Sequence, residues 1–151
     1  MEIALRPPHA AELPAASALC LRSKAHWGYD QAFIDACRNE LTLTPADLAE
    51  SAVALALSGD TMVGLGQISH KSGVAELDKL FVEPEWIGRG IGKVLFDWST
   101  GKARSLGART MLVTADPYAV PFYEKMGFEL IGEEPSASIP GRVLPVYRLT
   151  L

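Results

Sequence analysis

The segment from residue 77 to residue 106 constrains the fold most, because in it a strand turns directly into a helix around three glycines. Gly88, Gly90 and Gly92 stand at alternate positions, and the apolar residues after them recur at i, i+3, i+4 and i+7, the period of an amphipathic helix. The first backbone N–H groups of such a helix have no partner within it. The glycines leave these groups uncovered, so the segment predicts an anion site, most naturally for a pyrophosphate, on a helix that ends at Leu106.

The spacing in this turn does not fit two familiar phosphate-binding motifs. A P-loop needs a glycine five residues before its Gly-Lys pair and Ser or Thr after it, whereas Ile87 and Val94 occupy those positions. The dinucleotide-binding fingerprint needs a glycine where Lys93 stands, and it belongs to the first βα unit of its domain. Arg89 and Lys93 add positive charge. From the glycines alone, a helix start without any ligand is the alternative.

Strands and helices follow one another along the chain in an order that predicts a mixed α+β fold. Three strands in succession come before the glycine-rich turn, two of them joined by a hairpin at Gly59-Asp60. We expect strands at residues 3–6, 53–58, 62–69, 75–82, 110–115, 128–132 and 143–149, helices at 9–23, 29–37, 90–106 and 119–126, and a helical turn starting at Thr44. This order is typical of one mixed sheet with helices on its faces.

Composition narrows the class of protein. The 151 residues suffice for a single domain, 1–151, with a core of its own. A net charge of −4 disfavours nucleic acid as a partner. The chain also lacks a run of about 18 apolar residues, which would predict a membrane span. Neither a signal peptide nor a zinc-ligand spacing is visible, and Cys20 and Cys37 are expected to be buried thiols. We therefore expect a cytoplasmic protein without a metal, a nucleic-acid partner or a membrane partner.

Three segments together resemble the GCN5-related N-acetyltransferase (GNAT) superfamily. They are Leu80-Phe81-Val82-Glu83-Pro84, Gly88-Arg89-Gly90-Ile91-Gly92-Lys93 and Phe122-Tyr123-Glu124-Lys125-Met126-Gly127-Phe128. The resemblance covers residues 50–132, and the order of elements fits over the whole chain. It implies an α+β fold with a mixed, mostly antiparallel central sheet, splayed between its fourth and fifth strands, with a bulge in the fourth strand and helices on both faces. The implied function is acetyl-CoA-dependent transfer of an acetyl group directly to a primary amine of a small molecule or protein.

The same resemblance implies acetyl-CoA as the co-substrate and no metal. It also indicates which residues would bind acetyl-CoA. Backbone amides of the glycine-rich turn would hold the pyrophosphate, although the family's first Arg or Gln is Ile87 here. The fourth strand would pair with the pantetheine arm, and a backbone N–H near Phe81 or Val82 would polarise the thioester carbonyl. Asp116 stands where many relatives carry an Asn that contacts pantetheine. The expected cofactor-binding residues are Leu80, Phe81, Val82, Gly88, Arg89, Gly90, Ile91, Gly92, Lys93, Asp116 and Tyr123.

Direct acetyl transfer to an amine requires a base and an acid. An alkylammonium group with a pKa of about 10.4 must lose a proton before it can attack. Glu76 and Asp78 share one face of the predicted strand, and either could accept that proton, directly or through water; the family's usual position favours Glu76. The alternative is that they are ordinary exposed carboxylates. Tyr123, the tyrosine of the family's Phe-Tyr-x-x-x-Gly-Phe segment, is expected to protonate the departing thiolate, unless it packs on the sheet with its hydroxyl in solvent.

Two segments are expected to select the acceptor. Residues 24–30 gather aromatic and polar groups between two helices, and residues 136–145 form a loop interrupted by Pro and Gly. The candidates for acceptor binding are Trp27, Tyr29 and Arg142. Trp27 could instead cap an apolar core, and Arg142 pairs with an acceptor carboxylate or remains a solvated charge. A non-catalytic acyl-CoA sensor or scaffold of the same fold stays open, as does a homodimer.

Overall fold

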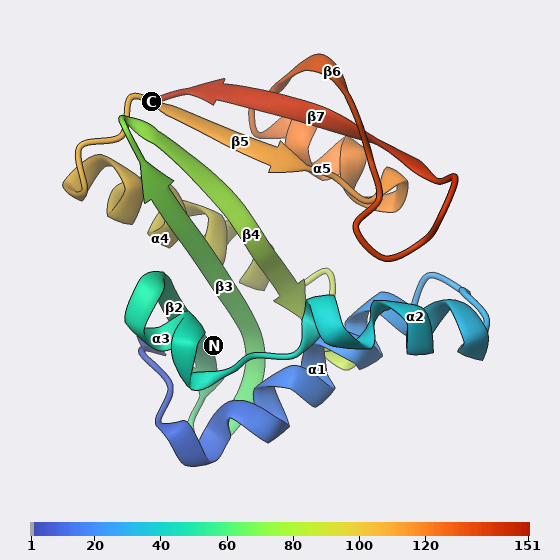
Figure 1. Cartoon of the computed structure of the whole chain (residues 1–151). Coiled ribbons are helices and arrows are strands. Elements are labelled where there is room, and N and C mark those ends of the chain that lie inside the picture. Colours follow the sequence, from blue (N-terminus) through green and yellow to red (C-terminus); the bar gives the residue numbers. More distant parts are fainter. Residues whose placement is uncertain (1) are drawn as a thin grey trace.

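The computed structural model describes residues 2–151, whose strands form one seven-stranded sheet in the order β1-β2-β3-β4-β5-β7-β6 (Figure 1). The strands are β1 (Ala4–Arg6), β2 (Ala52–Ser58), β3 (Thr61–Lys71), β4 (Val74–Val82), β5 (Thr110–Thr114), β6 (Glu129–Pro135) and β7 (Val143–Thr150). The α-helices are α1 (Leu13–Ala25), α2 (Gln31–Leu41), α3 (Pro45–Glu50), α4 (Ile91–Ser105) and α5 (Val120–Lys125). None of the helices within residues 2–151 has both the length and the apolar character needed to cross a membrane.

The expected elements are present, and their ends differ by a few residues. The helix expected at 9–23 begins with a 3-10 turn at Ala10–Glu12 and continues as α1. The helix expected at 29–37 starts later, because the Asp30 carboxylate caps it by accepting the N–H of Phe33 at 2.8 Å, and it runs on to Leu41. The prediction of a mixed α+β sheet is therefore confirmed.

The sheet is split between β4 and β5, as expected. These two strands are parallel and pair only between Val74–Glu76 and Thr110–Leu112, whereas every other strand pair of the described residues is antiparallel. Beyond Glu76 they diverge, which Figure 1 shows as the widening gap between the green and orange arrows. The backbone groups of β4 that face this gap therefore have no strand partner over its second half.

A bulge at Asp78 changes which side chains of β4 face which side of the sheet. The pairing with β3 passes from Gln67 opposite Lys79 to Ile68 opposite Leu77, so Asp78 is the extra residue. Leu77 packs in the core beneath α4, and Phe81 packs on the opposite face with α1. Between them, Asp78 and Lys79 both point to the α1 side, which regular alternation would forbid.

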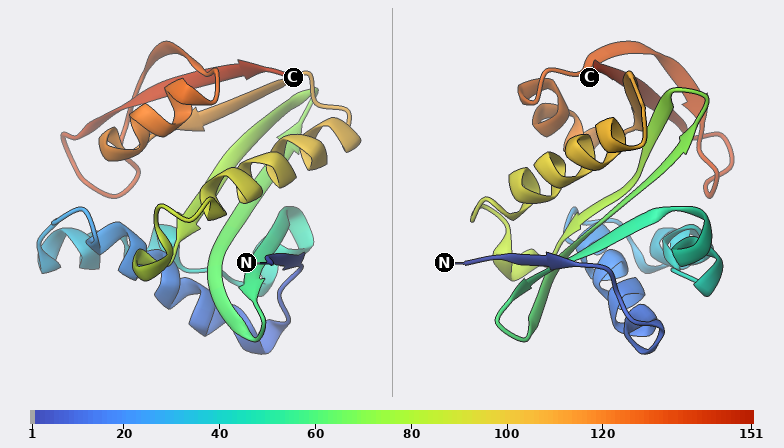
Figure 2. Two further views of the ribbon diagram at one scale, coloured as in Figure 1. Left: turned by 180° about the vertical axis from the view of Figure 1, so that it is seen from behind. Right: turned by 90° about the vertical axis from the view of Figure 1, so that its left-hand side faces the viewer.

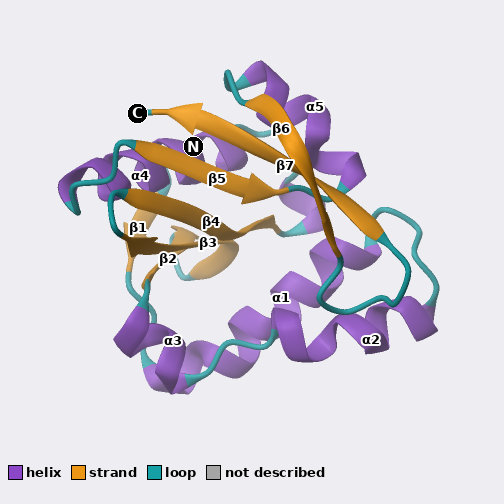
Figure 3. Cartoon of the chain, turned by 45° about the horizontal axis from the view of Figure 1, so that its top comes forward, coloured by secondary structure: helices purple, strands orange, loops and turns teal. Residues whose placement is uncertain are grey.

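The helices cover both faces of the sheet. Helices α1, α2 and α3 lie on one side, and α4 and α5 lie on the other (Figure 2, right; Figure 3). The α1 side buries Leu55 and Leu65, together with the free thiols of Cys20 and Cys37, which confirms that both cysteines are buried. Helix α4 approaches β3 closely at Gly64, where an added Cβ would lie 2.9 Å from Leu95 Cδ1.

Candidate functional site

A cavity of about 1090 Å³ lies where β4 and β5 separate. Its walls are the second half of β4 from Leu77 to Val82, the turn into α4, the end of β5, helix α5, and residues of α1, α2 and α3. It therefore touches elements from both faces of the sheet.

The start of α4 forms one end of the cavity. Gly88 and Gly90 both have a φ of +84°, a backbone conformation that side chains other than glycine rarely adopt. The first helical bond is donated by Val94 to the Gly90 carbonyl at 3.2 Å, and within the described residues the amides of Ile91, Gly92 and Lys93 have no acceptor. These three residues line the cavity. The start of α4 therefore presents three unpaired amides to the cavity.

The two predicted cations of this turn differ in placement. Lys93 lines the cavity, and its Nζ donates to Asp97 Oδ1 at 2.5 Å. The Arg89 guanidinium instead lies over the ring of Trp86, 4.6 Å from its centroid, and Arg89 is not among the lining residues. Of these two cations, only Lys93 therefore adds its charge to the cavity wall.

The two strand carboxylates also differ. Both side chains are exposed, but Asp78 lines the cavity and Glu76 does not. Asp78 keeps solvent contact through the cavity, but the surrounding protein displaces part of its hydration, and this raises the pKa of its carboxyl. The charge of Glu76 raises that pKa further, while Ser69 and Lys79 oppose the shift. Asp78 is thus the strand carboxylate that a ligand in the cavity meets.

A polar network behind Asp78 escaped the sequence predictions. Lys79 donates to Gln67 Oε1 at 2.9 Å, and the Gln67 amide nitrogen donates to Ser51 Oγ at 2.9 Å and to Asp47 Oδ1 at 3.2 Å. All four residues line the cavity. They come from β3, β4, α3 and the residue that follows α3, and a Gln in the middle of an apolar strand was the one signal that could have revealed them.

Tyr123 lies in the wall of the cavity and is only 6% exposed. Its ring packs edge-on against Phe122 and Phe128, with centroids 5.4 Å away in each case. Burial raises the pKa of its phenol, and the charge of Asp116 adds to the effect. The hydroxyl makes no hydrogen bond within residues 2–151, so it is free to meet a ligand.

Asp116 is already surrounded by donors from two distant segments and from its own turn. Its carboxylate accepts from Lys24 Nζ at 2.6 Å, from the Tyr29 hydroxyl at 3.0 Å and from the Tyr118 N–H at 2.9 Å, and Arg142 Nη2 lies 3.6 Å away. Burial acts to raise the pKa of Asp116, but these partners, Lys24 first, outweigh it and hold the pKa below its usual value. A ligand amide would have to compete with these partners.

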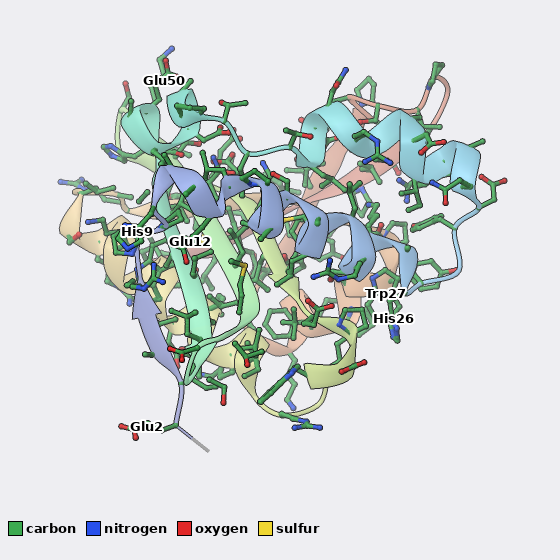
Figure 4. All side chains as sticks on the ribbon, turned by 90° about the horizontal axis from the view of Figure 1, so that it is seen from below. Glu2, His9, Glu12, His26, Trp27 and Glu50 are labelled. Atoms are coloured by element: carbon green, nitrogen blue, oxygen red, sulfur yellow. The ribbon has the colours of Figure 1, made fainter. Side chains whose placement is uncertain are left out.

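The predicted acceptor-side residues separate into two groups. Trp27 is 37% exposed, stacks on Tyr118 with centroids 5.3 Å apart, and lines the cavity rim with it. Figure 4 places Trp27 beside His26, at the end of α1 far from His9 and Glu12. Tyr29 and Arg142 do not line the cavity.

Those two residues instead lie behind Asp116. The Tyr29 hydroxyl accepts from Arg142 Nη2 at 2.8 Å while it donates to the Asp116 carboxylate. Burial and then the charge of Asp116 raise the pKa of Tyr29 to about 12. Tyr29 and Arg142 therefore support the wall of the cavity rather than face into it.

Comparison with known proteins is consistent across sequence and fold. Residues 17–138 match a family model described as an acetyltransferase (GNAT) domain. The uncharacterized N-acetyltransferase YjcF of Bacillus subtilis is 29% identical over 85 residues, covering 56% of this chain and 61% of that protein. The peptidyl-lysine N-acetyltransferase YjaB of Salmonella typhimurium is 34% identical over 73 residues, covering 48% of each. The chain thus spans less than two thirds of the length of these curated relatives.

Solved structures share the fold over almost the full chain. The PaiA N-acetyltransferase of Thermoplasma acidophilum, in complex with coenzyme A, has a TM-score of 0.80 at 17% identity and 100% coverage of both chains. A GCN5-related N-acetyltransferase structure from Rhodopseudomonas palustris has a TM-score of 0.82 at 24% identity, covering 98% of this chain and 95% of that one.

Proposed function

The chain belongs to the GNAT family of acetyltransferases, and from this we propose that it is an acetyl-CoA-dependent N-acetyltransferase that acts directly on a primary amine of a small molecule or protein. The observation that carries the proposal is the cavity between β4 and β5. One end of it presents unpaired helix amides, and the α1 side presents a carboxylate, with Tyr123 in the wall. An anionic acyl donor and a cationic acceptor could therefore meet there.

Acetyl-CoA would supply the acetyl group as a thioester. We propose that the amides of Ile91, Gly92 and Lys93 hold its pyrophosphate, since free N–H groups at a helix start favour an anion. The unpaired second half of β4 would bind the pantetheine arm like an added strand, and a backbone N–H near Phe81 or Val82 would polarise the carbonyl. The presence of coenzyme A in the Thermoplasma structure of similar fold supports coenzyme A as the ligand.

Of the two strand carboxylates, we propose Asp78 as the base. It lines the cavity and Glu76 does not. Its raised pKa also brings it closer to that of an alkylammonium group, and each unit gained lowers the cost of proton transfer by about 1.4 kcal/mol. Direct transfer and transfer through one water are both compatible with this role.

We propose Tyr123 as the group that protonates the departing thiolate. Burial raises the pKa of its phenol, so the hydroxyl stays protonated at neutral pH and holds a proton to donate. A thiol has a pKa of about 8.5, below that of this phenol, so proton transfer from Tyr123 to the thiolate is unfavourable by itself and is completed when Tyr123 regains a proton. The free hydroxyl in the cavity wall supports this role.

Thiol release from acetyl-CoA in the presence of a panel of amines tests the proposal. Asp78→Asn should lower kcat/KM by about 100-fold or more, because general base catalysis contributes at least that much. Glu76→Gln, on the same face of the same strand, is the matched control and should stay within about threefold of wild type. Coenzyme A affinity should be unchanged in both variants.

Two results would contradict the proposal. Binding of acetyl-CoA without acceptor-dependent thiol release would favour the non-catalytic acyl-CoA sensor. Failure to bind coenzyme A at millimolar concentration would exclude the enzyme and the sensor together.

A further inference from the structure

The bulge in β4 sets a carboxylate and an ammonium group side by side in the cavity. Asp78 and Lys79 are consecutive, yet both side chains face the α1 side and both line the cavity. In a regular strand, neighbours point to opposite faces. Neither side chain forms an ion pair within 4.0 Å in the part of the chain that the structure describes. Both charged groups can therefore pair with a ligand.

The ammonium group of Lys79 is held in place by a neutral partner. Its Nζ donates to Gln67 Oε1 at 2.9 Å, and Gln67 is only 4% exposed. The amide nitrogen of Gln67 is fixed by Ser51 Oγ at 2.9 Å and Asp47 Oδ1 at 3.2 Å, so the amide oxygen must face Lys79. An ammonium has three N–H donors, and within residues 2–151 only one of them is used.

This arrangement differs from that of Lys24 and Lys93 in the same cavity, and from that of Lys125, which has no ion pair within residues 2–151 but is exposed. Lys24 pairs with Asp116 at 2.6 Å, and Lys93 pairs with Asp97 at 2.5 Å. Lys79 is half-buried and has given up hydration, but no carboxylate within 4.0 Å compensates it. An anionic group on the acceptor would provide that compensation, directly beside the proposed base.

Resting on the proposed function, we propose that the acceptor is a zwitterion, a primary amine with a carboxylate one or two carbons away, as in an amino acid. Asp78 takes the amine and Lys79 takes the carboxylate. The amine nitrogen forms the new amide bond to the acetyl carbonyl carbon while the carbon–sulfur bond breaks. The acceptor ammonium gives up two protons: one passes to Asp78 before the attack, and the second, released as the amide forms, restores Tyr123 after its hydroxyl has protonated the departing sulfur. The acceptor carboxylate takes no part in the chemistry, so Lys79 acts as a specificity residue.

A diamine is a weaker candidate for the acceptor, because most of the other carboxylates on the acceptor side already have partners. Asp47 is engaged by Gln67 and by the Thr44 N–H, which it accepts at 2.8 Å, and Glu40 accepts the Ser138 hydroxyl. Glu50 remains, at the end of α3 (Figure 4). A second amine on the acceptor would have to bind there, away from the Asp78–Lys79 pair.

Matched pairs of acceptors test the inference. Each pair joins an amino acid to the amine left when its carboxylate is removed: leucine with isopentylamine, phenylalanine with phenethylamine, and lysine with 1,5-diaminopentane. Wild type should use the amino acids at least tenfold better in kcat/KM. Lys79→Met should erase that preference, mainly by raising the KM of the amino acids, while thiol release with the plain amines persists. That second result also shows that the variant is folded.

Two further variants complete the test. Lys79→Arg keeps the positive charge and should retain most of the preference, whereas Lys71→Met removes an exposed lysine at the end of β3 and should change nothing. A wild-type preference for plain amines, diamines or peptide lysines that Lys79→Met leaves unchanged would overturn the inference, while acceptor-dependent thiol release would still support the proposed function. Coenzyme A binding with no release for any acceptor would refute the proposed function, and the inference with it.

Discussion

Tyr123 is the residue whose substitution most directly tests the proposed proton transfer to the thiolate. Tyr123→Phe keeps the ring between Phe122 and Phe128 and removes only the hydroxyl. We expect kcat to fall about 100-fold and acetyl-CoA affinity to stay within twofold, because the hydroxyl would act on the leaving sulfur rather than on binding. Steady-state kinetics and calorimetric titration with acetyl-CoA measure the two effects.

A buried tyrosine outside the cavity provides the control for that experiment. The Tyr147 hydroxyl donates to Glu124 Oε2 at 3.3 Å, and Tyr147 does not line the cavity. Tyr147→Phe should therefore leave kcat unchanged. Wild-type turnover in Tyr123→Phe would remove this residue from the role of acid.

Gly64 tests how closely α4 packs on the sheet. A Cβ at this position would lie 2.9 Å from Leu95 Cδ1 and 3.0 Å from the Phe81 carbonyl oxygen, and a backbone atom cannot easily move away. We expect Gly64→Ala to destabilise the protein by about 1–3 kcal/mol in urea unfolding. Gly132→Ala, where no atom lies within 4 Å, should change stability far less. Equal stability of the two variants would contradict the close approach.

Up to the bulge, sequence periodicity correctly predicted which face of the sheet each side chain of β4 occupies. Glu76 and Asp78 do share a face, as their spacing indicates, but the extra residue adds Lys79 to that face and leaves Glu76 outside the cavity. The signal for the bulge was the odd spacing of Leu77 and Leu80, which both pack beneath α4. The partners of Asp116 could not be predicted, because they come from distant segments.

At the scale of single elements, α4 has a strained start and a regular interior. Each part contains a glycine, so substitutions can test the two parts separately. Gly90 has a φ of +84°, so Gly90→Ala should cost about 1–2 kcal/mol or force the turn to rearrange. Rearrangement would move the amides of Ile91–Lys93, and we expect coenzyme A affinity to fall at least fivefold. Calorimetric titration with coenzyme A and urea unfolding measure the two effects.

Gly101 is the matched control in the same helix. It has open space around its Cα and lies in the helix interior, so Gly101→Ala should stabilise the protein by about 0.5–1 kcal/mol and leave coenzyme A affinity unchanged. Undiminished coenzyme A affinity in Gly90→Ala would argue against a role of this turn in binding the pyrophosphate.

Elements were predictable where their pattern was local. The apolar period of α4 predicted both of its ends, and the capping residues of α3 predicted its start, within one residue of those found. The end of β6 was missed by three residues, because all seven of its residues are exposed and carry no alternation. The insertion of β7 between β5 and β6 depends on contacts between distant strands, which periodicity does not encode.

At the scale of the whole molecule, the two halves of the sheet, β1–β4 and β5–β7, are joined through only a short stretch of paired strand, the seam between β4 and β5. Strands β4 and β5 pair over three residues each, and the Asp116 network provides a second link. Lys24 and Tyr29 come from the end of α1 and the turn after it, whereas Asp116 follows β5 and Arg142 precedes β7. The network therefore ties the helices of one half to the strands of the other. The cytoplasmic location and the homodimer considered in the sequence analysis remain predictions.

This link makes stability depend on pH in a defined direction. The pKa of Asp116 is lower in the folded protein than in the unfolded chain, where it is about 3.9. Its stabilising contribution is therefore complete above the unfolded value and is lost as the pH falls through the folded value. Asp116→Asn should lower stability at pH 7 by about 3 kcal/mol, because it leaves Lys24 and Arg142 without their carboxylate.

The same variant should also flatten the acid side of the stability profile. Urea unfolding between pH 7 and pH 3 should show the difference between wild type and Asp116→Asn shrinking below about pH 4, since protonation removes the same charge from wild type. Asp35→Asn, which breaks an exposed pair with Arg38, is the control and should change stability at pH 7 far less. If the curves of wild type and Asp116→Asn run parallel down to pH 3, the charge of Asp116 does not hold the two halves together, and the seam between β4 and β5 must do so through packing alone.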